Sequence, residues 1–390
     1  MPALAGKRPT VHLVDATLFY SPTSGGVKRY LSAKHAWLAA HTSWEHTIVV
    51  PGLDTHLERG GVCTLSGYPV PWTFNYRLPL NPRRWTRLLD ALEPTLIEAG
   101  DVFHPAWAGW LVAQRRGIPL TGFYHSNLPQ LIGRRLFGTE PVLRRYVQWL
   151  YEHFDLLFAP SRVMCEYLRS LGLTQVVHQP LGVDAEVFNP ARRTNTLRKR
   201  LGLPSRARVL VFAGRFAEEK NLPVLFQAFA RLGRPYHLLL IGGGRRSRPA
   251  ANVTMMPYRR DSFELAQWIA SADALVHAGT KETFGLVILE AMACGRPVVA
   301  ARAGAFPEFV DETVGALAEP HSAAGMAAAI ASLYERDIDV VGAAARARVL
   351  RHFTWNRAFH TQLASYASLL GAQRVPVAEA PILELRSPSS

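Results

Sequence analysis

Two glutamates in the second half of the chain, Glu282 and Glu290, are separated by seven mostly apolar residues. The apolar run predicts a helix over residues 285–293, which Gly295 ends. A helix that is apolar on every face is normally buried in a domain core. Because an unpaired buried charge is costly, we expect Glu290 either to face a polar cleft or to pair with a basic residue from elsewhere in the chain.

The spacing of these glutamates suits an extended, charged ligand. If both were helical, eight residues would place them roughly 80° apart around the axis and about 12 Å apart along it. That separation is close to the length of a nucleoside diphosphate-sugar. The loop before the helix would present free N–H groups and the positive end of the helix dipole, which suit a phosphate. Glu282 lies in this loop.

Length and composition indicate an ordinary globular protein of two domains. The chain has 390 residues, of which 48% are hydrophobic. No apolar run approaches the roughly 18 residues of a membrane span, and no signal-peptide core follows Lys7 and Arg8, so we expect a cytoplasmic protein. The three cysteines are far apart, without the paired spacing of a zinc or redox motif, and are best interpreted as buried thiols.

The chain is strongly basic, with a formal charge of +14 and a pI near 10.1. Such a charge could meet nucleic acid, an anionic membrane or a phosphorylated ligand, although each cluster fits an arginine-rich solvated surface equally well. Few aromatic residues lie among the clusters and no recognition motif occurs, which argues against nucleic acid. The clusters are Arg83, Arg84 and Arg87; Arg134 and Arg135; Arg144 and Arg145; Arg192, Arg193, Arg198, Lys199 and Arg200; and Arg245, Arg246 and Arg248.

Strand-like and helix-like segments alternate in both halves, which predicts parallel sheets covered by helices. In such sheets ligands bind beyond the carboxyl ends of strands, where His104 and His125 follow two strand-like runs. The expected strands are 11–15, 47–50, 95–98, 120–124, 156–158 and 175–178 in the first half, and 208–212, 237–241, 273–277 and 297–300 in the second.

Two glycines and one acidic pair are candidate ligand-binding features. Gly25 and Gly26 lie between the first strand and a helix, where they would let the backbone approach a ligand closely. No Walker sequence and no G-x-G-x-x-G occurs. Asp337 and Asp339 have the Asp-x-Asp form of a metal site, but they lie between two late helices, away from any strand end, so we expect no metal there.

Several short motifs occur together in one order along the chain, and their combination resembles family 4 of the retaining glycosyltransferases. The resemblance implies the GT-B fold, an α/β architecture of two doubly wound Rossmann-like domains with an interdomain cleft. The motifs are Gly25-Gly26, His125, Gly214-Arg215, Glu219-Lys220 and the stretch from Glu282 to Glu290.

The turn-rich, basic segment around residue 187 marks the expected domain boundary. Residues 1–186 would form the N-terminal, acceptor-side domain, and residues 187–352 the nucleotide-sugar-binding domain. Residues 353–372 would form a helix that crosses back to the first domain, and residues 373–390 a flexible tail.

The resemblance implies that Arg215 and Lys220 clamp the donor diphosphate, since an arginine fork and a lysine charge can neutralise a leaving diphosphate without a metal. Glu290 would bind the ribose and Glu282 the hydroxyls of the transferred sugar. His125 would lie beside the anomeric carbon. The first domain would close over the diphosphate through Gly25 and Gly26, and the second would cradle it with the backbone N–H groups of Phe284, Gly285, Leu286 and Val287.

The implied reaction is transfer of a hexose, with mannose from GDP-mannose favoured, to an acceptor hydroxyl with retention of configuration. Its partners would be the nucleotide-sugar and a glycan or lipid-linked acceptor, with an anionic membrane surface as a further partner at the inner face. No cofactor, metal or nucleic acid is expected. The alternatives are a UDP-sugar-dependent glucosyltransferase, a UDP-N-acetylglucosamine 2-epimerase-like enzyme and a nucleic-acid-binding protein.

One loop departs from the family pattern. Ala305 and Phe306 follow Gly304 where family members often carry a second glycine and an aliphatic residue. We expect this change to alter how the loop lies against the donor.

Overall fold

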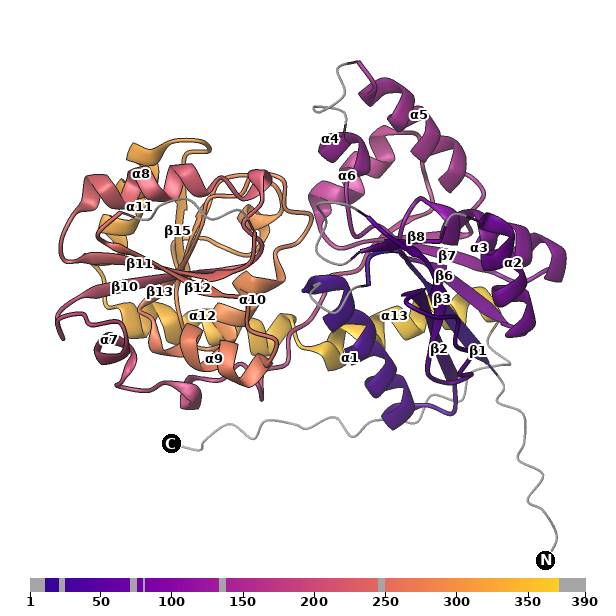
Figure 1. Cartoon of the computed structure of the whole chain (residues 1–390), viewed down its shortest axis with the longest axis horizontal. Helices are drawn as coiled ribbons and strands as arrows, with labels where there is room; N and C mark the ends of the chain where they lie inside the picture. Colours follow the sequence, from indigo (N-terminus) through magenta and orange to yellow (C-terminus); the bar gives the residue numbers. More distant parts are fainter. Residues whose placement is uncertain are drawn as a thin grey trace, which may run out of the picture.

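The protein was analysed as a computed structural model that describes residues 11–20, 25–70, 76–79, 81–132, 138–244 and 250–371. The expected tail, residues 373–390, lies outside the described residues, as do the arginines at 134, 135, 245, 246 and 248. The chain forms two α/β halves, each built on its own parallel sheet (Figure 1). The doubly wound architecture expected from the alternating pattern is confirmed.

The first half contains a seven-stranded sheet in the order β3-β2-β1-β6-β7-β8-β9, in which every pairing is parallel. The strand order reverses direction at β1 and β6, which is where open α/β sheets bind ligands beyond the carboxyl ends of their strands. The strands are β1 (His12–Ala16), β2 (Glu45–Gly52), β3 (Val62–Ser66), β6 (Leu96–Ala99), β7 (Leu120–Phe123), β8 (Leu156–Ala159) and β9 (Val176–His178), with a small antiparallel pair β4 (Tyr68–Pro69) and β5 (Arg77–Leu78).

The described residues of the first half form the helices α1 (Gly26–His41), α2 (Pro82–Ala91), α3 (His104–Arg116), α4 (Leu128–Ile132), α5 (Glu140–Tyr151) and α6 (Arg162–Ser170). The prediction that His104 ends a strand-like run is wrong, because His104 is the first residue of α3. Asp101 forms a turn by accepting a hydrogen bond from the Phe103 N–H at 2.9 Å. Pro105, which favours the first turn of a helix, then starts α3.

The second half contains a six-stranded parallel sheet in the order β12-β11-β10-β13-β14-β15. Its central strands are almost fully buried, as the apolar runs predict. The strands are β10 (Arg208–Ala213), β11 (Tyr236–Gly242), β12 (Val253–Pro257), β13 (Ala274–His277), β14 (Val298–Ala301) and β15 (Gly315–Ala318); the helices are α7 (Leu197–Arg200), α8 (Leu222–Leu232), α9 (Ser262–Ser271), α10 (Leu286–Ala293), α11 (Ala323–Leu333) and α12 (Ile338–His352).

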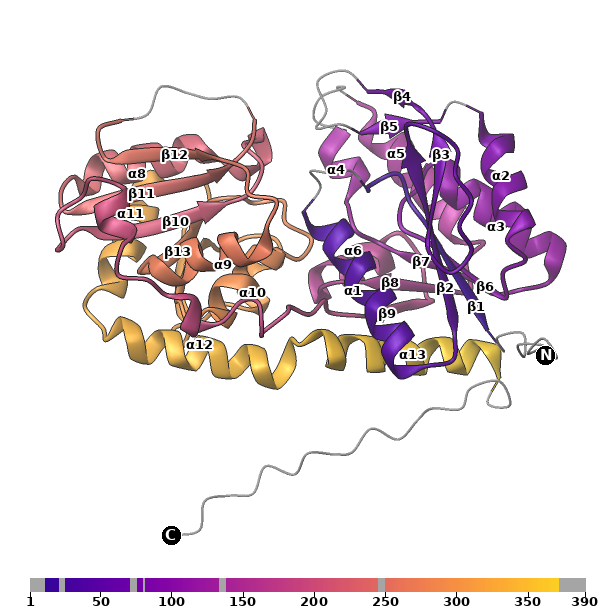
Figure 2. The ribbon, with the colours of Figure 1, turned by 60° about the horizontal axis from the view of Figure 1, so that its bottom comes forward.

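The last helix, α13 (Trp355–Leu370), leaves the second half and packs against α1 of the first, as expected of a helix that crosses back. Figure 2 shows α12 and α13 following one another along one side of both halves. None of the helices in the described part of the chain is long and apolar enough to cross a membrane.

A buried charge cluster holds α13 to the first half. Lys34 of α1 donates hydrogen bonds to Asp15 of β1 at 3.1 Å and to Glu98 of β6 at 2.9 Å. Tyr366 of α13 donates to Glu98, and its hydroxyl also accepts from Lys34 at 2.8 Å. These four side chains, which we call the buried charge cluster, are at most a few per cent exposed, so their charges depend on one another for compensation.

Candidate active site

Glu282 lies in the loop between β13 and α10, at the carboxyl edge of the second sheet. The helix begins at Leu286, so the spacing calculated for two helical glutamates does not describe the pair. The helix cannot start earlier because Gly285 has a left-handed φ of 88°. A Cβ atom at this position would also lie 2.6 Å from Cε1 of Phe306, so only glycine fits here without movement.

Lys220 forms an ion pair with Glu282 at the centre of this loop. It ends the short 3₁₀ helix η2 (Glu218–Lys220), and each of the two side chains is 15% exposed. Burial on its own would raise the pKa of Glu282, but the charges of Lys220 and the neighbouring His277 lower this pKa to about 2. The carboxylate is therefore ionised at neutral pH and held against a cation.

His277, the last residue of β13, was not singled out by the sequence analysis. Its Nε2 lies 3.8 Å from Oε1 of Glu282, and its Nδ1 accepts a hydrogen bond from the Gly279 N–H at 3.0 Å. Burial lowers the pKa of His277 to about 4, so the ring is neutral at pH 7. Since Nδ1 is an acceptor, the proton of the neutral ring is on Nε2, which faces Glu282. The sequence offered one indication of a role for His277, namely its position at the carboxyl end of an expected strand.

Arg215 does not join the Lys220 pair directly. Its guanidinium donates to Oε1 of Glu219 at 3.2 Å, and its side chain is 47% exposed. Its charge still contributes to lowering the pKa of Glu282. The structure therefore brings Lys220 and Glu282 together and places Arg215 nearby on a side chain with room to reorient.

The start of α10 presents backbone donors next to this pair. The first N–H groups of a helix have no acceptor within it, and no described residue accepts a backbone hydrogen bond from residues 284–287. Phe284 anchors the turn, with its buried ring packed edge-on against Phe309 at 4.7 Å. Free backbone N–H groups at the start of a helix are suited to an anion, so the phosphate cradle remains a prediction.

Glu290 is 1% exposed and pairs with Arg29, which α1 supplies from the first half. The sequence analysis expected this carboxylate either to face a polar cleft or to pair with a basic residue, and the structure contains the basic partner. The Arg29 guanidinium also lies over the ring of Phe188, 5.7 Å from its centre. Arg29 was not among the predicted residues, because nothing in the sequence relates it to a glutamate 261 positions away.

His125 follows β7 and lies at the junction with the second half. Its ring stacks on Phe123 at 4.3 Å with an interplanar angle of 13°, and meets the edge of Tyr30 at 5.2 Å. Its carbonyl oxygen accepts a hydrogen bond from Oγ1 of Thr283 at 2.9 Å, which joins it to the loop that carries Glu282. Burial lowers the pKa of His125 to about 3, so this imidazole is also neutral at pH 7.

The glycines near the site fall into two groups. A Cβ atom on Gly25 or Gly26, at the start of α1, would meet no atom of the described residues within 4 Å. The packing of this part of the chain does not require their small size, and the backbone there is accessible to a ligand. By contrast, a Cβ atom on Gly304 would lie 2.6 Å from the Glu282 carbonyl oxygen, so this glycine is needed for the loop itself.

The loop that departs from the family pattern lies directly behind Glu282. The Ala305 N–H donates to the Glu282 carbonyl oxygen at 3.1 Å. The buried ring of Phe306 meets His277 edge-on at 4.9 Å and fills the space beside Gly285. The aromatic residue therefore supports the loop from behind.

The acidic and histidine side chains of the described residues do not form a metal site. Over the described ranges, no group of three or more His, Cys, Asp and Glu side chains is close enough together to hold a metal ion. Asp337, half of the Asp-x-Asp pair, instead caps α12 by accepting from the N–H groups of Asp339 and Val340 at 2.9 and 3.2 Å.

Two doubly wound halves that meet across the Glu282 loop have the architecture of the GT-B fold. The solved structure of sucrose-phosphate synthase from Thermosynechococcus elongatus shares this architecture, with a TM-score of 0.78 over 93% of this chain and 100% of that one. The two sequences are 21% identical, so this likeness shows the fold. The expected GT-B fold is confirmed.

Sequence comparison gives the family within that fold. The family model described as Glycosyltransferase Family 4 matches residues 24–187, and the one described as Glycosyl transferases group 1 matches residues 207–336. The D-inositol 3-phosphate glycosyltransferase of Xylanimonas cellulosilytica is 32% identical over 296 residues, which cover 67% of this chain and 69% of that protein. The chain belongs to glycosyltransferase family 4.

A further relative matches almost the full length. The GDP-mannose-dependent alpha-(1-6)-phosphatidylinositol dimannoside mannosyltransferase of Mycobacterium tuberculosis is 29% identical over 388 residues, covering 93% of this chain and 98% of that protein. The protein is thus a glycosyltransferase that takes its sugar from a nucleotide-sugar.

Proposed function

We propose that the protein transfers a hexose, with mannose from GDP-mannose favoured, to a hydroxyl group of a glycan or lipid-linked acceptor with retention of configuration. The observation that carries this proposal is the ion pair of Lys220 with Glu282, beside the free N–H groups at the start of α10. Two hydrogen bonds, from Thr283 to the His125 carbonyl and from Lys281 to the Gln130 carbonyl, join this loop to the first half.

In this proposal the positive groups hold the donor diphosphate. Lys220, Arg215 and the N–H groups of residues 284–287 neutralise it, which lets it leave without a metal ion. Glu282 accepts hydrogen bonds from the transferred sugar, for which its low pKa is suited. The open backbone at Gly25 and Gly26 contacts the diphosphate from the first half.

Glu290 would bind the ribose through the carboxylate oxygen that Arg29 does not hold. Arg29 contacts Oε1, which leaves Oε2 as an acceptor. This assignment places the nucleoside beside α1 and makes Arg29 part of the donor site.

The chemistry favoured is attack on the face that the diphosphate leaves. A bond forms between the acceptor oxygen and the anomeric carbon while the bond from that carbon to the phosphate oxygen breaks. The acceptor proton passes to an oxygen of the departing diphosphate. His125, neutral at pH 7, would contribute a hydrogen bond beside the anomeric carbon without adding a charge that repels the developing oxocarbenium ion.

A donor panel tests the proposal. We expect GDP-mannose to raise the Tm of the protein and to be hydrolysed slowly without acceptor, whereas Lys220→Ala and Glu290→Ala abolish the Tm increase. The matched control is Lys199→Ala, since Lys199 is exposed on α7 and forms no ion pair with any described residue. A Tm increase with UDP-glucose alone would favour the UDP-sugar alternative, isomerisation of UDP-N-acetylglucosamine would favour an epimerase, and normal donor binding by both variants would refute the site.

The proposal includes binding to the inner face of an anionic membrane. Val142 and Trp149 on α5 are 69% and 39% exposed, and Arg144 and Arg145 of the same helix line a groove with Trp149. Apolar and basic side chains together suit a lipid surface. In a flotation assay we expect the protein to rise with phosphatidylglycerol liposomes, and Arg144→Gln/Arg145→Gln to reduce this; failure of the wild type to float would refute membrane binding.

A further inference from the structure

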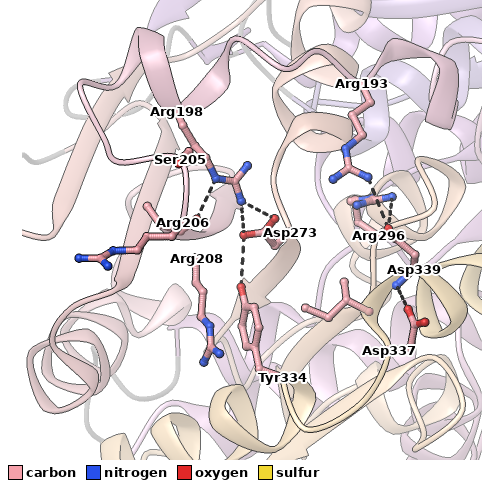
Figure 3. Close-up of a pocket in the computed structure, with 12 residues that line it drawn as sticks. Arg193, Arg198, Ser205, Arg206, Arg208, Asp273, Arg296, Tyr334, Asp337 and Asp339 are labelled. Carbon is pink, nitrogen blue, oxygen red and sulfur yellow. Dashed lines mark hydrogen bonds and ion pairs between the residues drawn. The ribbon is translucent and has the colours of Figure 1, made fainter.

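Figure 3 shows a second basic pocket. It lies at the edge of the second sheet opposite to the Glu282 loop. It has a volume of about 320 Å³ and forms around the amino ends of β10, β13 and β14. The six-residue strand β10 separates the two edges by roughly 20 Å. The pocket is therefore distinct from the donor site.

Five arginines and three aspartates line this pocket, and two of the aspartates are already engaged. Asp273 accepts from Arg198 at 2.7 and 2.8 Å and from the Val209 N–H at 2.7 Å. Asp337 caps α12 through its side chain. Asp339 is left to face the remaining arginines, which gives the pocket an excess of positive charge.

Arg193 and Arg296 converge on Asp339 at long distances of 3.4 and 3.5 Å (Figure 3). The Asp339 side chain is 73% exposed, so it is a weak and displaceable counter-ion. Arg296 is only 5% exposed, and its Nε has no hydrogen-bond partner among the described residues. Burial and the nearby charge of Arg193 both lower the pKa of Arg296. The positive charge of the buried Arg296 guanidinium is thus only partly compensated.

The other side of the pocket adds two more cations. Arg208 lies between the rings of Tyr236 and Tyr334, 5.0 and 4.4 Å from their centres, and donates to the Tyr236 hydroxyl at 2.5 Å. These contacts hold its guanidinium in place. Arg206 is exposed at the rim and forms no ion pair with any described side chain.

We propose that this pocket binds a small ligand through a phosphate or diphosphate group, which displaces Asp339 and bridges Arg193 and Arg296. Planar guanidinium groups match the oxygens of a phosphate in pairs, and the volume is at the lower end of small-molecule sites. The phosphate group belongs to a free anion or to a lipid headgroup. The site is independent of the donor assignment and would stand if that assignment failed.

The test measures pyrophosphate binding by calorimetry in the full chain. The background variant is Lys220→Met/Glu282→Gln, which removes both charges of the donor-site pair together. We expect saturable binding that Arg193→Gln/Arg206→Gln weakens by about tenfold or more, since the charge-assisted contact of Arg193 and the positive charge of Arg206 at the rim are both lost. Asp339→Asn should strengthen pyrophosphate binding several-fold, because it removes the carboxylate that competes for the arginines. This variant changes the net charge by only one unit, so general electrostatic attraction at the rim predicts a smaller gain in affinity.

Controls separate the pocket from its surroundings. Arg231→Gln changes the charge of an exposed arginine on α8 and should leave binding unchanged. In the otherwise wild-type chain, Arg193→Gln/Arg206→Gln should lower the number of bound pyrophosphates by one, which keeps the test valid if the background variant fails to fold. Absence of saturable binding, or an equal loss in Arg231→Gln, overturns the proposal.

A vesicle experiment distinguishes the two sources of phosphate. Binding to phosphatidylcholine vesicles containing phosphatidic acid, lost in Arg193→Gln/Arg206→Gln but retained in Arg231→Gln, assigns a lipid headgroup. Binding of pyrophosphate without such vesicle binding assigns a free ligand. Failure of both refutes the pocket, whereas failure of the nucleotide-sugar panel would refute only the proposed function.

Discussion

Replacing Lys220 by methionine leaves the buried Glu282 without its counter-ion. The contacts of this carboxylate lower its pKa from 4.5 to about 2, which corresponds to roughly 3 kcal/mol of stability at neutral pH. Each kcal/mol shifts Tm by about 2–4 °C in a domain of this size, so we expect the transition of the second half to fall by roughly 6–12 °C. The apolar substitute keeps most of the length of the side chain, so the loss reports mainly the charge.

The pH dependence follows from the direction of the pKa shift. A depressed carboxylate pKa stabilises the folded state above the ordinary value of 4.5, and this contribution is lost as the pH falls towards 2. The difference in Tm between wild type and Lys220→Met should therefore be full at pH 6–7 and shrink as the pH falls below about 4.5. Differential scanning calorimetry over this range measures it.

Two further variants make this test specific. Lys199→Met removes an exposed lysine and should leave Tm unchanged within about a degree. Lys220→Met/Glu282→Gln removes both charges and should recover most of the lost Tm, because no buried carboxylate then lacks a partner. A Tm unchanged by Lys220→Met, or a double variant with a Tm no higher than that of Lys220→Met, would refute the coupling.

The other predictions concern contacts away from this pair. Arg29→Met should destabilise the protein by about 3 kcal/mol by leaving Glu290 buried and unpaired, and Arg29→Lys should restore part of this loss; urea unfolding measures both, and equal stability of all three proteins would contradict the pairing. Gly285→Ala should lower the free energy of unfolding by at least about 2 kcal/mol, because the residue has a positive φ and its Cβ atom would contact a buried ring. Gly25→Ala should instead leave Tm unchanged and weaken donor binding. The reverse pattern would show that the two glycines have been assigned the wrong roles. Tyr366→Phe should cost about 1–2 kcal/mol by removing a hydroxyl from the buried charge cluster, and a neutral effect on thermal unfolding would mean that α13 is held by its apolar contacts alone.

The central strands of both sheets could be predicted because they are buried on both faces and read as continuous apolar runs. The sequence analysis missed β3, β12 and β15, which are edge strands of their sheets, and the two-residue strands β4 and β5, although it predicted the remaining edge strand, β9. An edge strand is only partly covered, so its residues alternate or mix in polarity and the apolar signal is weak.

The site could be predicted where its chemistry is local in sequence. The glycine at the start of α10 and the lysine after β10 sit in strand-loop-helix turns that are visible in the sequence. The pairing of Arg29 with Glu290 depends on how the two halves meet, which no local pattern encodes. The role of His277 depends on which ring nitrogen faces Glu282, and this requires the hydrogen bond from Gly279.

The order in which a ribosome makes this chain bears on the buried charge cluster. Lys34 and Glu98 are synthesised early, but Tyr366, which hydrogen-bonds to both, follows more than 250 residues later. During that interval the first half can form its sheet, yet α13 does not cover the buried charge cluster, which stays open to water. The first half therefore completes its core only when the second half has been made, which couples the maturation of both to the arrival of a single terminal helix.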